Sequence, residues 1–203
     1  AREAGGGRGS GANETLVAVD TGAFAVSALS LQLSSEGLHA LSWFSRDRVG
    51  NTELARSTQA AVDLTPPVTE LAISTPRGHR EGGLVVGPET VFALSAADPV
   101  SSDVAAGVKD TALAVSTTVF GLYKGSFTLP GADGSRIIQF FSRDNVLNAE
   151  AIKSTAVLMD ATAPRTELVL TAGSTHTAAS GVYVSSSTLL RFDAVDPMTA
   201  GVA

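Results

Sequence analysis

Short stretches in which large apolar residues alternate with small or polar ones recur along the chain. In residues 92–96, FALSA, large residues alternate with small ones, and in residues 190–194, LRFDA, they alternate with charged ones. A period of two places alternate side chains on opposite faces, which indicates a half-buried β-strand and not an amphipathic helix. Two further pairs repeat the alternation, Leu71 with Ile73 and Leu168 with Leu170.

Turn-forming segments separate these predicted strands. The segments TPRGHREGG, LPGADGS and DATAPRT are rich in residues that favour turns and linkers. Their spacing leaves about seven short strands in a unit of about 100 residues, which predicts an all-β chain of tandem immunoglobulin-like β-sandwiches. Trp43 lies in a late strand of its unit, with Phe140 in its place in the next copy, and is predicted to be buried.

The chain repeats itself at an interval of 97 residues, as shown by FSRDRVGN from Phe44 and FSRDNVLN from Phe141. The match continues into TPPVTELAIS from Thr65 and TAPRTELVLT from Thr162. We therefore predict three copies: a first half-repeat with a glycine-rich start (residues 1–64), a complete middle repeat (65–161) and a third half-repeat (162–203). One hypothesis is that the chain is a piece of a longer repeat protein, and another is that the two half-repeats join head to tail between molecules by strand exchange.

Composition excludes several functional classes. The chain has no cysteine, which excludes disulfides, thiolate metal sites and a cysteine nucleophile. Its net charge of −6 and its lack of Lys and Arg clusters argue against a nucleic-acid partner. No apolar run reaches the roughly 18 residues that span a membrane, and the start AREAGGGRGSGAN is not a signal peptide, so we expect any export signal to be removed or to lie outside this sequence.

The stretch from Glu36 to Leu71 resembles the bacterial immunoglobulin-like repeats found in tandem in large secreted and surface-attached proteins. It combines a G-H-x-hydrophobic strand, a D-x-x-G-N-x-E turn and a D-x-T-x-P linker. The resemblance implies a stalk, adhesin, filament component or accessory module outside the cell. The residues that match are Gly37, His39, Asp47, Gly50, Asn51, Glu53, Asp63, Thr65 and Pro66.

The second copy departs from this pattern at two positions. Arg136 stands in place of His39, and Leu147 stands in place of Gly50. Because a leucine rarely adopts a positive φ, we expect the turn to have an ordinary backbone at this position.

No catalytic motif is recognisable. The three histidines, His39, His79 and His176, occupy non-equivalent places in the repeat, and we interpret them as surface residues. No Gly-x-Ser-x-Gly elbow and no glycine-rich phosphate loop occurs. We therefore expect a protein that is not an enzyme and needs no organic cofactor.

The acidic turns offer candidate calcium ligands. Oxygen donors alternate along both copies of the turn, and Asp63, Asp98 and Asp160 fall near the predicted ends of the units, where calcium could rigidify a junction. The alternative is that these side chains cap backbone amides in the turns, which the incomplete ligand set favours. The candidate calcium ligands are Asp47, Asn51, Glu53, Asp144, Asn148 and Glu150.

Two further groups of residues are interpreted structurally. Arg46 and Arg143 are expected to form cross-strand or interdomain salt bridges, and Pro66, Pro67 and Pro164 are expected to stiffen the linkers.

These observations predict a non-catalytic segment of an exported bacterial repeat protein that acts as a stalk, spacer or filament component. Its expected partners are neighbouring repeats of the same or identical chains, with no nucleic acid and no membrane insertion. The alternative is an adhesin or carbohydrate-binding module, which exposed aromatic residues would favour. With one Trp and two Tyr in the chain, Tyr123 and Tyr183 are the candidates for such a platform.

Overall fold

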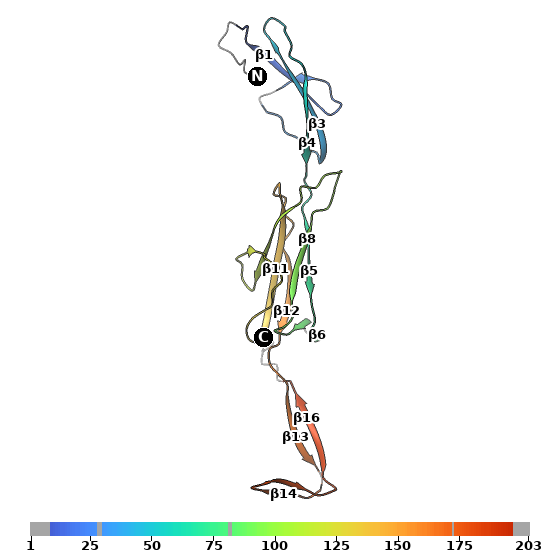
Figure 1. The fold of residues 1–203 in the computed structure, drawn as a ribbon, viewed down its shortest axis with the longest axis vertical. Helices are drawn as coiled ribbons and strands as arrows, with labels where there is room; N and C mark the ends of the chain where they lie inside the picture. Colours follow the sequence, from blue (N-terminus) through green and yellow to red (C-terminus); the bar gives the residue numbers. More distant parts are fainter. Residues whose placement is uncertain (1–8, 28–29, 81–82, 172, 197–203) are drawn as a thin grey trace. The chain divides into compact units, whose positions relative to one another are not determined.

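The computed structural model describes residues 9–27, 30–80, 83–171 and 173–196. These residues form strands and no helix, so the predicted all-β class is confirmed (Figure 1). It follows that the described part of the chain holds no long apolar helix of the kind that crosses a membrane. The chain divides into two compact units, one made of Ala1–Glu70, Ala96–Ala112 and Phe141–Ile152, the other of Leu71–Ser95, Leu113–Phe140 and Lys153–Ala203.

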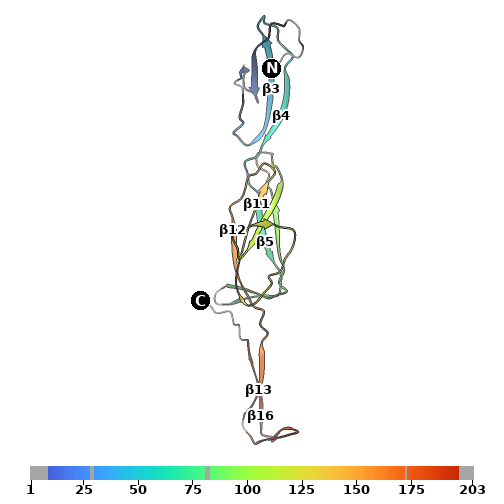
Figure 2. The same cartoon turned by 90° about the vertical axis from the view of Figure 1, so that its left-hand side faces the viewer.

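The middle repeat folds as a β-sandwich of immunoglobulin-like type. Strands β5 and β8 form one sheet (Figure 1). The other sheet has the order β10-β9-β11-β12-β7-β6, in which β7 runs parallel to β12. Its central strands β11 and β12 are labelled in Figure 2. The strands are β5 (Val68–Ile73), β6 (Arg77–Arg80), β7 (Gly83–Val86), β8 (Phe92–Ala97), β9 (Val108–Val115), β10 (Gly121–Leu122), β11 (Gly134–Asp144) and β12 (Lys153–Met159). The structure thus adds the short β10 to the roughly seven strands that the spacing predicts.

Apolar residues from both sheets fill the space inside the second unit. Alternation along each strand decides which side chains face the core: Ile138 is fully buried, whereas its neighbour Ile137 is 47% exposed. Phe92 packs against Phe127, with ring centroids 5.4 Å apart. Burial of such side chains stabilises the sandwich without any disulfide. The buried cluster comprises Val86, Phe92, Leu94, Leu129, Ile138, Phe140, Val157 and Met159.

The first half-repeat forms a four-stranded antiparallel sheet of order β2-β1-β3-β4. Its strands are β1 (Ala12–Val19), β2 (Ala25–Val26), β3 (Gly37–Asp47) and β4 (Arg56–Val62). Trp43 on β3 is partly buried, so it is less fully covered than the sequence predicts. Its counterpart Phe140 is 4% exposed in the middle repeat, where a second sheet contributes to the same core.

The third half-repeat contains two separate antiparallel pairs. Strand β13 (Arg165–Thr171) pairs with β16 (Leu189–Val195), and β14 (Thr175–Ala178) pairs with β15 (Gly181–Val184). Leu190 and Phe192 on β16 are 56% and 70% exposed. The residues at the same places in the middle repeat, Phe92 and Leu94, belong to the buried cluster. The third half-repeat therefore displays the face that is covered in the complete sandwich.

Candidate functional site

The acidic turn after β11 is held together by its own side chains. Oδ1 of Asp144 accepts hydrogen bonds from the amides of Val146 and Asn148, at 2.9 and 2.8 Å. Oδ2 of Asp144 accepts from Nδ2 of Asn148 at 2.7 Å. These are the contacts of an Asx turn, in which a carboxylate takes over the amides that no strand partner satisfies.

The turn after β3 repeats this geometry within 0.1 Å. Oδ1 of Asp47 accepts from the amides of Val49 and Asn51 at 2.9 and 2.8 Å, and Oδ2 accepts from Nδ2 of Asn51 at 2.8 Å. The hydrogen bond from the Asn51 side chain, followed by that from the Asn51 amide and others, lowers the pKa of Asp47 below its ordinary value. Both copies therefore show the hydrogen bonds that the turn-capping interpretation predicts.

The backbone of this turn is left-handed in both copies. Gly50 has φ of +89° and Leu147 has φ of +76°. The expectation that a leucine rules out a positive φ here is therefore wrong. A leucine side chain makes a positive φ costly in free energy, but the hydrogen bonds of Asp144 and Asn148 impose this backbone conformation on Leu147.

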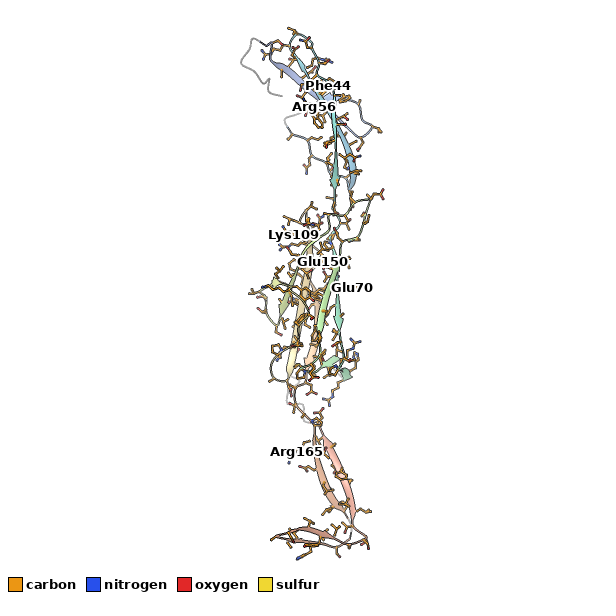
Figure 3. All side chains as sticks on the ribbon, viewed as in Figure 1. Phe44, Arg56, Glu70, Lys109, Glu150 and Arg165 are labelled. Carbon is orange, nitrogen blue, oxygen red and sulfur yellow. The ribbon has the colours of Figure 1, made fainter. Side chains whose placement is uncertain are left out.

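A glutamate closes each turn from the other side. Oε1 of Glu53 accepts from the amide of Ser45 at 2.9 Å, and Oε1 of Glu150 accepts from the amide of Ser142 at 3.0 Å (Figure 3, where Glu150 is labelled). In the middle repeat Glu150 also accepts from the amide of Thr69 at 3.2 Å and from its hydroxyl.

A chain of buried hydroxyl groups continues from this glutamate. The hydroxyl oxygens of Thr69 and Ser142 lie 2.6 Å apart, and those of Ser142 and Thr111 lie 2.7 Å apart. Thr69 is 1% exposed and Ser142 is fully buried. Sequence reasoning missed this network, although the 97-residue interval pairs Ser142 with Ser45, whose hydroxyl lies 3.0 Å from that of Thr15.

The linkers after β4 and β12 are each fastened by an equivalent set of bonds, which we call the linker staple. The hydroxyl of Thr65 donates to Oε1 of Glu36 at 2.6 Å, and the hydroxyl of Thr162 donates to Oδ2 of Asp133 at 2.6 Å. The amide of Thr65 donates to Asp63 at 3.0 Å, and the amide of Thr162 donates to Asp160 at 3.2 Å. Each residue of the first linker staple lies 97 positions before its counterpart in the second.

Three carboxylates come together at the end of the middle repeat. Asp63, Asp98 and Asp144 each offer an oxygen, and these oxygens lie within 4.8 Å of one another. Asp63 comes from the linker, Asp98 follows β8 and Asp144 ends β11. Asp63 is 8% exposed, Asp144 is fully buried, and Asp98 is partly buried. We call this group the aspartate cluster.

Backbone amides satisfy part of the aspartate cluster. Oδ2 of Asp63 accepts from the amide of Ala106 and Oδ2 of Asp98 from the amide of Gly107, both at 2.6 Å. Oδ1 of Asp98 is buried and accepts no hydrogen bond from any described residue. Carboxylate oxygens are the ligands that hard divalent cations prefer, so this arrangement can hold such an ion.

Of the candidate calcium ligands in the sequence, the structure brings Asp144 alone into the aspartate cluster. Asn148 donates both amide hydrogens, to Asp144 Oδ2 and to the backbone oxygen of Asp63, at 2.7 and 2.9 Å. Asp160 serves the linker staple. Calcium binding by the other candidates stays a prediction; these are Asp47, Asn51, Glu53, Asn148 and Glu150.

The predicted cross-strand salt bridges are confirmed. Arg46 lies 3.2 Å from Glu14 on the neighbouring strand, and Arg143 lies 3.0 Å from Asp110. Both pairs are at least partly exposed, so each contributes up to about 1 kcal/mol.

His39 departs from the surface role expected of it. It is 8% exposed, and Nδ1 lies 3.0 Å from Oδ2 of Asp20 while Nε2 lies 2.9 Å from the backbone oxygen of Ser35. The Asp20 hydrogen bond, followed by that of Ser35, raises the pKa of His39, and the same contact with His39 lowers the pKa of Asp20.

The two tyrosines differ in their surroundings. Tyr123 packs against the buried cluster and its hydroxyl accepts from the amide of Leu94 at 3.0 Å, so it is not a free platform. Tyr183 is 56% exposed, lies near the ring of His176, and its hydroxyl lies 2.8 Å from that of Ser180.

Comparisons with known proteins find similarity to several solved structures, among them the two of low sequence identity given below. No protein-family model and no curated protein matches the chain. Fibronectin(III)-like modules of CbhA from Clostridium thermocellum are 13% identical, with a TM-score of 0.40 over 78% of this chain and 82% of that one. A tetra-tandem repeat from the extending region of a large adhesion protein is 15% identical, with a TM-score of 0.31 over 91% of this chain and 56% of that one.

Proposed function

We propose that this chain is a spacer segment of an exported bacterial repeat protein, in which immunoglobulin-like sandwiches are joined by stiff linkers. The linker staple is the observation that carries this proposal, because it recurs at both linkers with the same donor, acceptor type and distance. A linker fastened in the same way at each step keeps successive sandwiches in a limited range of arrangements. The protein acts outside the cell as a stalk or filament component and catalyses no reaction.

The first linker also bonds to the repeat that follows it. Asp63 accepts from the amide of Ala106, and its backbone oxygen accepts from the side chain of Asn148. Thr65 on the same linker bonds to Glu36 of the preceding half-repeat. Side chains on a short segment thus tie it in both directions, which supports a nearest-neighbour coupling of the kind that stabilises repeat proteins.

Paired spin labels test the stiffness of the linker. Because the chain has no cysteine, two introduced cysteines, at Leu54 and Val119, give one defined pair of labels. Both positions are at least 74% exposed. We expect a narrow distribution of label distances that broadens in Thr65→Val, whereas Thr58→Val, an exposed threonine outside the linker, leaves it unchanged. A broad distribution in the unchanged linker would refute the spacer role.

We further propose that the exposed apolar face of the third half-repeat is covered by a neighbouring repeat of the same or an identical chain. Its exposed Leu190 and Phe192 correspond to the buried Phe92 and Leu94 of the middle repeat. Between identical chains, such head-to-tail contacts lead to open assemblies. Sedimentation over a hundredfold range of concentration distinguishes the two: growing oligomers indicate an identical chain, and a monomer throughout excludes strand exchange between molecules.

Tyr183 supports the alternative of a surface or carbohydrate ligand, because its ring is exposed next to His176. Glycan-array binding that is lost in Tyr183→Ala would favour that function over the spacer.

A further inference from the structure

We propose that protonated His39 locks the linker staple of the first linker and releases it when the ring loses its proton. His39 lies on β3 and bonds to the backbone of Ser35. The next residue, Glu36, accepts the hydroxyl of Thr65 in the linker staple. The histidine thus holds the segment that presents Glu36 to the linker. This inference uses the bonds of the linker staple and does not depend on the spacer function.

The hydrogen bonds of His39 require a charged ring. Nδ1 lies 3.0 Å from Oδ2 of Asp20, and Nε2 lies 2.9 Å from the backbone oxygen of Ser35. A carboxylate and a carbonyl both accept hydrogen bonds, so each needs an N–H group from the ring. Neutral imidazole has one N–H group, whereas imidazolium has two. The ring therefore makes both bonds only in its protonated form.

Loss of the proton changes the bond to Ser35. The carboxylate of Asp20 is the charged acceptor and binds the remaining N–H more strongly, so Nε2 is the nitrogen that loses its hydrogen. Without that hydrogen, Nε2 repels the carbonyl oxygen of Ser35. It can instead accept a hydrogen bond from the Ser35 hydroxyl, which lies 3.3 Å away. Deprotonation thus exchanges a bond to the backbone for a bond to a side chain, and the backbone next to Glu36 is released.

The middle repeat has the same bond with a permanent charge. Nη2 of Arg136 donates to the backbone oxygen of Ala132 at 2.8 Å, and both residues lie 97 positions after the two that form the first bond. The next residue, Asp133, is the hydroxyl acceptor of the second linker staple. A cation therefore holds the carbonyl before the acceptor in both repeats, but only that of His39 can titrate near neutral pH.

The residue beside the cation differs between the repeats in a matching way. Asp20 and Ser116 occupy equivalent places 96 positions apart, with φ of +53° and +51°. The side chain of each accepts a strand amide, that of Ala40 at 2.9 Å and that of Ile137 at 3.3 Å. A carboxylate thus accompanies the titratable histidine, and a neutral hydroxyl accompanies the arginine.

The titratable groups around His39 come from two segments. Asp20 faces the ring from the turn after β1, and Glu36 precedes His39 by three residues. The residues on β4 opposite this part of β3 do not titrate; they are Gln59, Ala60 and Ala61. The hydrogen bond from Asp20 raises the pKa of His39 above its ordinary value of about 6.5. The lock is therefore complete below about pH 6.5 and is lost as the pH rises through the folded pKa.

An NMR titration of the full chain from about pH 5 to 9 tests the lock. The ring of His39 reports its own midpoint, and the amides of Glu36 and Thr65 should shift with the same midpoint. The amides of Asp133 and Thr162 should show no transition at that pH, because Arg136 keeps its charge.

Exchanging the two cations assigns the response. His39→Arg should abolish the transition at both amides of the first linker staple. The reverse exchange, Arg136→His combined with Ser116→Asp, should create a transition at Thr162. Circular dichroism verifies that each variant folds.

Thermodynamic reciprocity gives a readout that leaves the histidine in place. If protonation of His39 strengthens the linker staple, removal of the staple hydroxyl in Thr65→Val must lower the pKa of His39. The control Thr58→Val, at an exposed threonine outside the linker, should leave that pKa unchanged.

Three results would overturn the lock. These are amides of Glu36 and Thr65 that do not follow the midpoint of His39, a transition that persists in His39→Arg, and a pKa of His39 that is equal in Thr65→Val and Thr58→Val. The first and third of these tests stand even if an exchanged variant fails to fold.

Discussion

Replacing Leu147 by glycine tests whether the acidic turn holds a side chain in an unfavourable backbone conformation. Leu147 has φ of +76° and is 59% exposed. A left-handed conformation costs a residue with a Cβ roughly 1–2 kcal/mol. Glycine removes that cost, but it also lowers the free energy of unfolding by about 0.4–1 kcal/mol because the unfolded chain gains conformational entropy.

Alanine is the proper reference, because it removes the leucine contacts and keeps the Cβ. The two terms leave Leu147→Gly more stable than Leu147→Ala by roughly 0.5–1 kcal/mol. The neighbouring Val146 is 54% exposed and has no positive φ. There the order should reverse, with Val146→Ala more stable than Val146→Gly by about the same amount.

Urea unfolding of the four variants measures these differences. The midpoint should shift while the slope stays constant, which identifies a change in stability and not in the surface exposed on unfolding. Thermal melts should differ by about 1–4 °C, as expected for a chain of this size. If glycine and alanine rank the same way at both positions, the turn does not impose the left-handed conformation and the reasoning fails.

Three further predictions test the core, the hydroxyl network and the histidine. Ile138→Ala should destabilise the chain by about 2–5 kcal/mol in urea unfolding, because Ile138 is fully buried, and clearly more than Leu41→Ala at the equivalent position of the first half-repeat, where Leu41 is only half-buried. Thr69→Val should cost about 1–3 kcal/mol, since it leaves Glu150 and Ser142 with fewer partners, whereas the exposed Thr58→Val should cost little. The raised pKa of His39 means that its contribution is complete below about pH 6.5 and is lost as the pH rises through the folded pKa, while the lowered pKa of Asp20 means that its contribution is lost as the pH falls through that value. Unfolding between pH 3 and 9 should therefore show a stability maximum that His39→Gln flattens, and an unchanged profile in that variant would contradict the assignment.

Local pattern and self-similarity predict the parts of this fold that depend on neighbours in sequence. Alternation predicts β8 and β16, and the Asp and Asn of each turn predict its capping bonds, because an Asx turn involves only residues at most four apart. The match between the copies predicts that Ser45 and Ser142 occupy equivalent places. These contacts are decided within a few residues, so the sequence alone contains the needed information.

Contacts between distant residues could not be predicted in this way. Asp98 meets Asp63 and Asp144 only because β8, β11 and the linker end at the same place, and no spacing in the sequence fixes that distance. The conformation of Leu147 was misjudged for a related reason. The residue type sets the free-energy cost of a positive φ, but the hydrogen bonds of neighbouring residues decide whether the backbone adopts it. Trp43 was judged by its apolar character, although burial also requires a covering layer.

The two linkers differ in the repeats to which their side chains bond. This difference distinguishes a linker that is fixed to one repeat from a linker that couples two repeats. At the second linker, Thr162 bonds to Asp133 and Asp160, and both acceptors come from the middle repeat or its end. At the first linker, Asp63 also bonds to Ala106 and Asn148, which belong to the repeat that follows. A linker staple that bonds only to the preceding repeat fixes the direction in which the chain leaves that repeat. Only bonds to both repeats make the unfolding of one sandwich change the stability of the next, so coupling through the first linker depends on Asp63 as well as on Thr65.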